Sequence, residues 1–131
     1  MATKEELNRI SESVIGAAIA VHRELGPGLL ESAYEACLEF ELRDRGFRII
    51  RQQVLPVHYR GVHVDCGFRI DLVVDDLLIV ELKAVDRLLP IHEAQLLTYL
   101  CLSGHTIGLL INFNVRVLKE GIKRLVQGFP D

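Results

Sequence analysis

The residues best suited to chemistry lie in one short stretch, 71–83, which reads Asp-Leu-Val-Val-Asp-Asp-Leu-Leu-Ile-Val-Glu-Leu-Lys. Two apolar runs flank an Asp-Asp pair, a pattern typical of a β-hairpin. Side chains alternate along a strand, so Glu81 and Lys83 share one face of the second strand. A two-residue loop would pair Asp71 with Val80, whereas a three-residue loop, or a bulge, places Asp71 directly across from Glu81. We predict a three-residue loop or a bulge, and with it a pair of facing carboxylates.

Facing carboxylates need compensation, because at about 4 Å they repel by about 4 kcal/mol at an effective dielectric of 20. A shared proton, a neighbouring cation or a hard metal ion between them would supply it. All the donor atoms are oxygens, which favours Mg²⁺ or Mn²⁺ over zinc. Lys83 is placed to orient a water molecule or to stabilise negative charge on a phosphate. The alternative is an exposed strand face on which Lys83 and Arg69 screen the two acids.

Two helical groups fall where such a site needs them. Glu31 lies in the first turn of a predicted helix and shares a face with Tyr34, although the helix dipole alone also favours an acid there. Gln95 and Tyr99 are four residues apart on a third helix, with His92 one turn earlier. An amide and a hydroxyl that project together can bind phosphate oxygens or a base edge. The alternative for this second group is an ordinary polar rim on an amphipathic helix.

The elements that must position these residues follow from periodicity and from turn residues. A capping box of Thr3 and Glu6 opens the first helix, and Gly26-Pro27-Gly28 ends it. The predicted helices cover residues 3–25, 29–45 and 90–103, and the predicted strands cover 47–59, 62–66, 68–74, 77–85, 105–113 and, at a sheet edge, 122–126. The order is two helices, a meander of strands, a helix and a strand, with a further strand at the end. It predicts an α/β fold in which helices pack on a mixed sheet.

The composition limits the class of protein. A length of 131 residues argues for a single domain, 1–131, and 50% apolar with 25% charged residues excludes a disordered chain. No apolar stretch is long enough to span a bilayer, so no membrane partner is expected. Three widely spaced cysteines and a charged start, Met-Ala-Thr-Lys-Glu-Glu, favour a cytoplasmic protein. The net charge of −3 provides no global attraction to nucleic acid, so such a function must rest on a local site.

The stretch Gly28-Leu-Leu-Glu31-Ser-Ala-Tyr34 resembles the signature of the GxxExxY protein family, and the preceding residues 21–27 are also similar to that family. The resemblance extends over about residues 15–126. It implies the PD-(D/E)XK nuclease superfamily and a restriction-endonuclease-like core of order α-β-β-β-α-β, with the first helix as an N-terminal extension. The proline of the superfamily's name is absent, since Ile70 precedes Asp71. This departure affects no metal ligand.

The resemblance also implies roles for the residues singled out above. Asp71 matches the superfamily's metal-binding aspartate, and Glu81 and Lys83 match its E-x-K motif. Metal ligation by Asp71, Glu81 and the main-chain oxygen of Leu82 is implied, with Mg²⁺ or Mn²⁺ as the cofactor and Lys83 positioning the attacking water. Glu31 matches the helical glutamate that completes the metal shell or helps to bind a second ion.

The same resemblance assigns substrate binding to the helices. Gln95 and Tyr99 match the Q-x-x-x-Y helix of the exonuclease-like branch and would steer a nucleic-acid strand, with Tyr34 as a further substrate-binding candidate. His22 is a possible extra metal ligand, although a lone histidine near a helix end is more often structural. The implied activity is metal-dependent hydrolysis of phosphodiester bonds, in DNA rather than RNA.

Two alternatives remain open. The chain can be a non-catalytic module that binds nucleic acid or protein on a nuclease fold, or an interaction protein whose acidic hairpin is merely surface. Since basic residues are scattered, a homodimer or a protein partner is expected to help in gripping a duplex.

Overall fold

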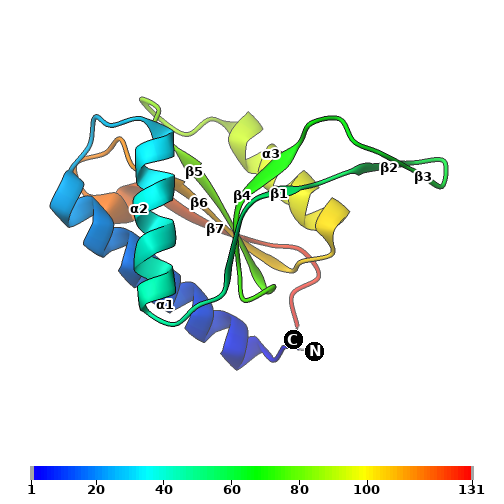
Figure 1. Cartoon of the computed structure of the whole chain (residues 1–131), viewed down its shortest axis with the longest axis horizontal. Helices are drawn as coiled ribbons and strands as arrows, with labels where there is room; N and C mark the ends of the chain where they lie inside the picture. The colour runs from blue at the N-terminus through cyan, green and yellow to red at the C-terminus, as the bar shows by residue number, and fades with distance from the viewer. Residues whose placement is uncertain (1, 131) are drawn as a thin grey trace.

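The computed structural model describes residues 2–130, which form an α/β fold with one main sheet and a projecting arm (Figure 1). The helices are α1 (Lys4–Leu25), α2 (Glu31–Asp44) and α3 (Pro90–Ser103), with a short 3₁₀ helix, η1 (Leu118–Gly121), near the end. The strands are β1 (Ile49–Val54), β2 (Val57–Tyr59), β3 (Val62–Val64), β4 (Arg69–Val74), β5 (Leu78–Lys83), β6 (Ile107–Asn112) and β7 (Ile122–Val126).

The main sheet has the strand order β1-β4-β5-β6-β7. Only β5 and β6 are parallel, and α3 makes the crossover between them. Helices α1 and α2 cover one face of the sheet and α3 covers the other (Figure 1). This is the predicted mixed α/β arrangement, consistent with a restriction-endonuclease-like fold, and α1 stands outside the α-β-β-β-α-β order as the expected N-terminal extension.

Alternation along the strands divides the apolar side chains between two cores, one on each face of the sheet. In β6, Leu109 points toward α1 and α2 while Leu110 points toward α3, and both are fully buried. Helix α3 lies close to β6, because a Cβ atom on Gly108 would come within 2.9 Å of Leu96. The predicted buried strand over 105–113 is therefore confirmed as β6, buried at all six positions.

The helix boundaries follow the signals in the sequence. Thr3 and Glu6 form the predicted capping box, with each side chain accepting a hydrogen bond from the other residue's backbone N–H. Pro90 opens α3, and Gly104 ends it in the left-handed conformation that glycine adopts without a steric penalty.

The hairpin between β4 and β5 has the predicted three-residue loop, 75–77. Leu72 pairs with Val80 and Val74 pairs with Leu78, a register that places Asp71 across from Glu81. Asp75 and Asp76 adopt positive φ angles of 51° and 55°, a conformation that aspartate tolerates better than most residues. The first requirement for the acidic site is thus met.

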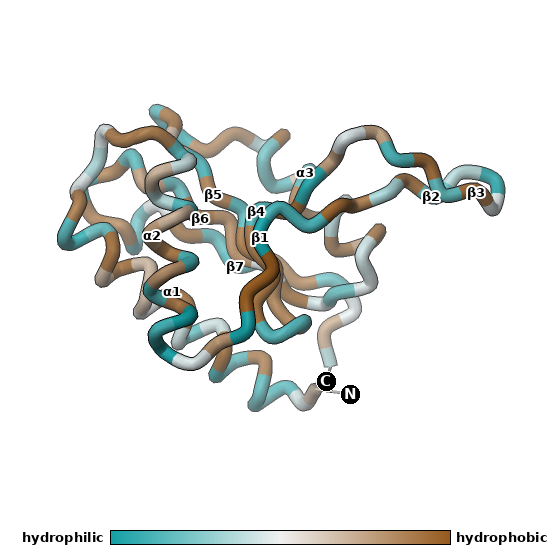
Figure 2. The backbone as a smooth tube through the Cα atoms, viewed as in Figure 1, coloured by the Kyte–Doolittle hydropathy of each residue, from teal (hydrophilic) through white to brown (hydrophobic). Residues whose placement is uncertain are grey.

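The predicted strand 47–59 is interrupted. It divides at Leu55-Pro56 into β1, which joins the main sheet, and β2, which pairs only with β3. Proline lacks the N–H that a ladder needs, and the chain leaves the sheet there. As a result, β2 and β3 form an arm that projects from the body between β1 and β4 (Figures 1 and 2), and residues 58–68 are all exposed.

Candidate metal and active site

The side chains of Asp71 and Glu81 each accept a hydrogen bond from a backbone N–H of the opposite strand. The Asp71 N–H donates to Glu81 Oε2 at 2.8 Å, and the Leu82 N–H donates to Asp71 Oδ2 at 2.9 Å. Each carboxylate therefore accepts a hydrogen bond from the opposite strand, where a regular ladder would use a main-chain carbonyl. The regular pairing of β4 and β5 stops at Leu72 and Val80, just before this point. The two acids occupy the fork where the strands part.

The Leu82 carbonyl faces the same fork. In a β-strand the N–H and C=O of one residue point to the same neighbour, and the Leu82 N–H points to Asp71. The Lys83 carbonyl points the other way and accepts a hydrogen bond from the Phe113 N–H at 2.9 Å. The two carboxylates and, by this strand geometry, the Leu82 carbonyl therefore face the same fork.

Burial disfavours the charged form of both acids. It raises the pKa of Glu81 from 4.5 to about 8, with the Asp71 charge as the second cause, and it raises the pKa of Asp71 from 3.8 to about 6. The half-buried Lys83 lowers the pKa of Glu81, but less than these two effects raise it. A nearby divalent cation would favour the charged form of both acids.

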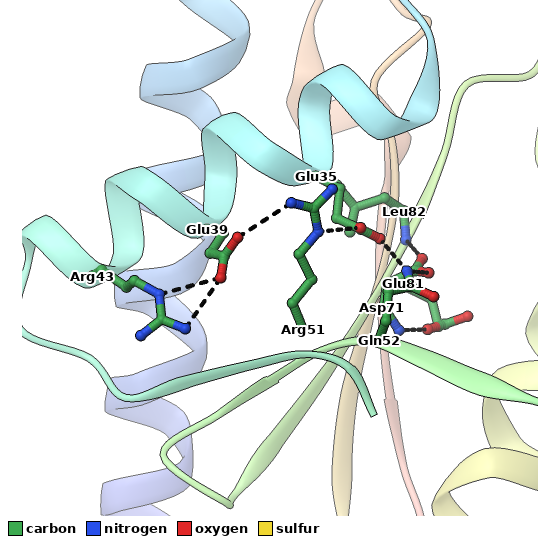
Figure 3. A network of polar contacts seen from close by, with 8 residues as sticks. All are labelled: Glu35, Glu39, Arg43, Arg51, Gln52, Asp71, Glu81 and Leu82. Carbon is green, nitrogen blue, oxygen red and sulfur yellow. Dashed lines mark hydrogen bonds and ion pairs between the residues drawn. The ribbon is translucent and has the colours of Figure 1, made fainter. Parts of the chain in front are cut away.

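Glu35 lies on the buried face of α2, and Gln52 links it to Asp71 (Figure 3). Arg51 Nε donates to Glu35 Oε2 at 2.6 Å, and Gln52 Nε2 donates to Glu35 Oε1 at 2.7 Å and to Asp71 Oδ1 at 3.2 Å. The charge of Glu35 also raises the pKa of Asp71, which places the two carboxylates close together. A third acid is therefore in reach of the fork, and it comes from a helix.

The structure places Glu31 elsewhere. Glu31 is the first residue of α2 and is exposed, one helical turn before the buried Glu35. An acid at this position satisfies the helix dipole, which is the alternative that the sequence left open. Of the two glutamates, it is Glu35 that accepts from Gln52, which also donates to Asp71 at the fork.

Tyr34 is part of the fold rather than of a binding surface. Its side chain is fully buried and stacks on Phe113 with ring centroids 4.6 Å apart. Its hydroxyl donates to the Gly26 carbonyl and accepts from the Leu29 N–H. Because Tyr34 has no exposed surface and its hydroxyl already donates and accepts a hydrogen bond, it cannot contact a substrate.

Gln95 and Tyr99 lie together on α3, and Tyr99 is close enough to the acids for their charges to raise its pKa. Gln95 Nε2 donates to the Tyr99 hydroxyl at 3.0 Å. Burial raises the pKa of Tyr99, and the charge of Glu81 raises it further, so the hydroxyl is near the fork. The predicted pairing of these two side chains on one helix face is confirmed.

His22 makes a structural contact. Its Nε2 atom lies 2.7 Å from the Val115 carbonyl oxygen, and the residue is buried near Phe113. A nitrogen that donates to a carbonyl cannot also bind a metal ion. The structure thus gives His22 the structural role that the sequence analysis held as the alternative to metal binding.

The donor set fits a hard divalent cation. Carboxylate and carbonyl oxygens are the ligands that Mg²⁺ and Mn²⁺ prefer, and a cation beside these acids would oppose the burial that raises their pKa values. Within residues 2–130, however, no three Asp, Glu, His or Cys side chains already converge as a complete metal-binding group. The third acid, Glu35, is held in its place by Arg51 and Gln52.

The fold and this acidic fork define the class: a mixed α/β domain of the restriction-endonuclease-like kind with an E-x-K strand facing an aspartate. A family model for the PD-(D/E)XK nuclease superfamily matches residues 8–125. The chain belongs to that superfamily, whose members generally use divalent metals. Neither the search of curated proteins nor the search of solved structures returned a match. None of the helices in residues 2–130 is long and apolar enough to cross a membrane.

The sequence analysis missed Glu35, Arg51 and Gln52. A signal for Glu35 was present, since Glu35, Leu38 and Leu42 share one buried helical stripe, and an acid on an apolar stripe indicates a buried charge. Arg51 and Gln52 carried no comparable signal, because their contacts depend on how α2 packs against β1.

Proposed function

We propose that this chain is a metal-dependent nuclease that hydrolyses phosphodiester bonds, in DNA rather than RNA, and that it belongs to the GxxExxY group of the superfamily. The observation that carries the proposal is the interlocked pair of the half-buried Asp71 and the buried Glu81 at the fork of β4 and β5, with Lys83 on the same strand as Glu81.

The proposed roles follow from the geometry. Asp71, Glu81 and the Leu82 carbonyl would hold Mg²⁺ or Mn²⁺, with Glu35 as the acid from the helix. When bound there, the ion would lower the pKa of a water molecule and offset charge on the scissile phosphate. Lys83 orients the water and stabilises negative charge on the phosphate, while Gln95 and Tyr99 contact the nucleic-acid strand on the α3 side.

A non-catalytic binding module on the same fold is the second candidate, and one observation favours it. A complete group of three metal-ligating side chains is not preformed within residues 2–130. A module that only binds has no need of one.

A cleavage assay separates the two candidates. Wild type is incubated with mixed single- and double-stranded DNA and RNA in Mg²⁺, in Mn²⁺ and in EDTA. We expect cleavage that needs the metal and is lost in Asp71→Asn and Lys83→Ala, since removal of a charged catalytic group costs on the order of a hundredfold or more in rate. Lys119→Ala, a change on the 3₁₀ helix η1, is the matched control and should keep full activity.

Cleavage that survives in Lys83→Ala would indicate a contaminating nuclease and contradict the mechanism. Metal binding that depends on Asp71, without cleavage of any of the substrates, would favour the binding module.

A further inference from the structure

Gln52 has a backbone conformation that its surroundings do not require. Its φ is +56°, in the left-handed region, although it lies in the middle of β1. For a residue with a side chain this conformation costs roughly 1–2 kcal/mol relative to an ordinary one. Within residues 2–130, four non-glycine residues have positive φ, and the other three lie in the turns of hairpins, where such angles are common.

The distortion interrupts the sheet at one point. Arg51 pairs with Leu72 and Gln53 pairs with Ile70, but the pair between them, Gln52 and Asp71, is missing from the ladder. Gln52 is exposed and β1 is an edge strand, so core packing does not force the backbone into this shape. The strain therefore coincides with the acidic fork, and strain retained at such a place points to a functional contact.

What the distortion achieves is visible in the side chain (Figure 3). The amide nitrogen of Gln52 donates to Glu35 Oε1 at 2.7 Å and to Asp71 Oδ1 at 3.2 Å, using one hydrogen for each. It thereby joins an acid on helix α2 to an acid on strand β4. These are two like charges on separate elements, which would otherwise move apart.

An amide suits this task better than a cation would. Arg51 forms an ion pair with Glu35. A second cation between Glu35 and Asp71 would neutralise the negative charge that attracts a metal ion. The neutral amide orients both carboxylates and leaves their negative charge in place. We propose that Gln52 is a positioning residue of the metal site, an inference that rests on the proposed function.

The test compares two glycine substitutions on adjacent residues of one strand. Gln52→Gly removes the amide and relieves the left-handed strain, so thermal stability without metal should stay the same or rise. Its Kd for Mn²⁺, measured by titration calorimetry, should rise about tenfold or more, the usual loss when a group that orients metal ligands is removed. Gln53→Gly removes a side chain whose buried oxygen has no hydrogen-bond partner, and it should leave the Kd unchanged.

Asp71→Asn separates failure of this inference from failure of the proposed function. If wild type shows no Mn²⁺ binding that Asp71→Asn removes, the metal site itself is wrong, and the inference falls with it. If Asp71→Asn abolishes binding but Gln52→Gly retains the wild-type Kd, only the role of Gln52 is wrong. Should Gln52→Gly fail to fold, Gln52→Asn replaces it, because asparagine accepts the left-handed region and its shorter side chain cannot span both acids; an unchanged Kd there would likewise overturn the role.

Discussion

Asp71 and Glu81 form a pair that the free protein tolerates at a cost. Both are largely removed from water and face each other across the fork, so removing one charge should relieve the repulsion. The backbone hydrogen bond from Asp71 survives in Glu81→Gln, because the amide oxygen can accept it.

We expect Glu81→Gln to raise the melting temperature in EDTA by several degrees at pH 8, since about 1 kcal/mol corresponds to roughly 3–5 °C in a domain of this size. The same variant should lose the stabilisation that Mg²⁺ or Mn²⁺ gives wild type. Differential scanning fluorimetry with and without metal measures both. A lower melting temperature in EDTA would show that the charge of Glu81 stabilises the fold, contrary to this account.

The direction of the pKa shifts fixes a pH dependence. A carboxyl whose folded pKa is raised contributes stability that is fully present below its unfolded pKa of about 4 and is lost as the pH rises through its folded pKa. For Asp71 and Glu81 these folded values are about 6 and about 8.

In EDTA, the free energy of unfolding of wild type relative to Glu81→Gln should therefore fall between about pH 5 and pH 8. Urea denaturation at several pH values measures this difference. Saturating Mg²⁺ should remove the fall, because a bound cation favours the ionised acids. A difference that stays constant over this range would contradict the raised pKa of Glu81.

The connection between α1 and α2 depends on Tyr34, which follows the loop it stabilises. Its hydroxyl joins the Gly26 carbonyl at the end of α1 to the Leu29 N–H before α2. Tyr34→Phe keeps the ring on Phe113 but leaves these two backbone groups without their partner.

Tyr34→Phe should lower the free energy of unfolding by about 1–2 kcal/mol and leave the Kd for Mn²⁺ unchanged. Glu31→Gln on the same helix should change stability by less than about 1 kcal/mol, since only an exposed charge near the helix dipole is lost. Urea denaturation and calorimetry test both. A large loss of metal affinity in Glu31→Gln would restore Glu31 as the helical ligand in place of Glu35.

The two cores of the molecule share one sheet, so we infer that residues 2–130 unfold as a single cooperative unit. Leu109 and Leu110 are neighbours on β6, and each lies in a different core. Leu109→Ala and Leu110→Ala should each cost about 2–5 kcal/mol and shift the urea midpoint without changing the slope of the transition. A second transition in either variant would show that the two faces of the sheet unfold separately.

Much of the architecture was predictable because its signals are local. The capping box at Thr3, the proline at 90 and the apolar run that became β6 each depend on residues near in sequence, and each led to the observed element. The facing of Asp71 and Glu81 was likewise predicted, through a three-residue loop or a bulge, and the structure has the three-residue loop. The prediction of one strand over 47–59 was only partly right, because the chain leaves the main sheet at the proline at 56.

The site was predictable on the strands and less so on the helices. Alternation alone places Glu81 and Lys83 on one strand face, and helical spacing alone pairs Gln95 with Tyr99. The choice between Glu31 and Glu35 is different, because the two lie one turn apart on α2. Which of them reaches Asp71 depends on the rotation of that helix against the sheet.

The amino-acid order was thus sufficient for most of the elements and for the facing of the two acids in the hairpin, since these follow from short-range periodicity and turn chemistry. The superfamily was indicated by a resemblance in motifs, not by periodicity. Packing between distant segments decided the rest: the burial that raises the pKa of the acids, the contact of Glu35 with Gln52, the structural contacts of Tyr34 and His22, and the left-handed conformation of Gln52. Such properties depend on distances between residues far apart along the chain, which no local pattern encodes.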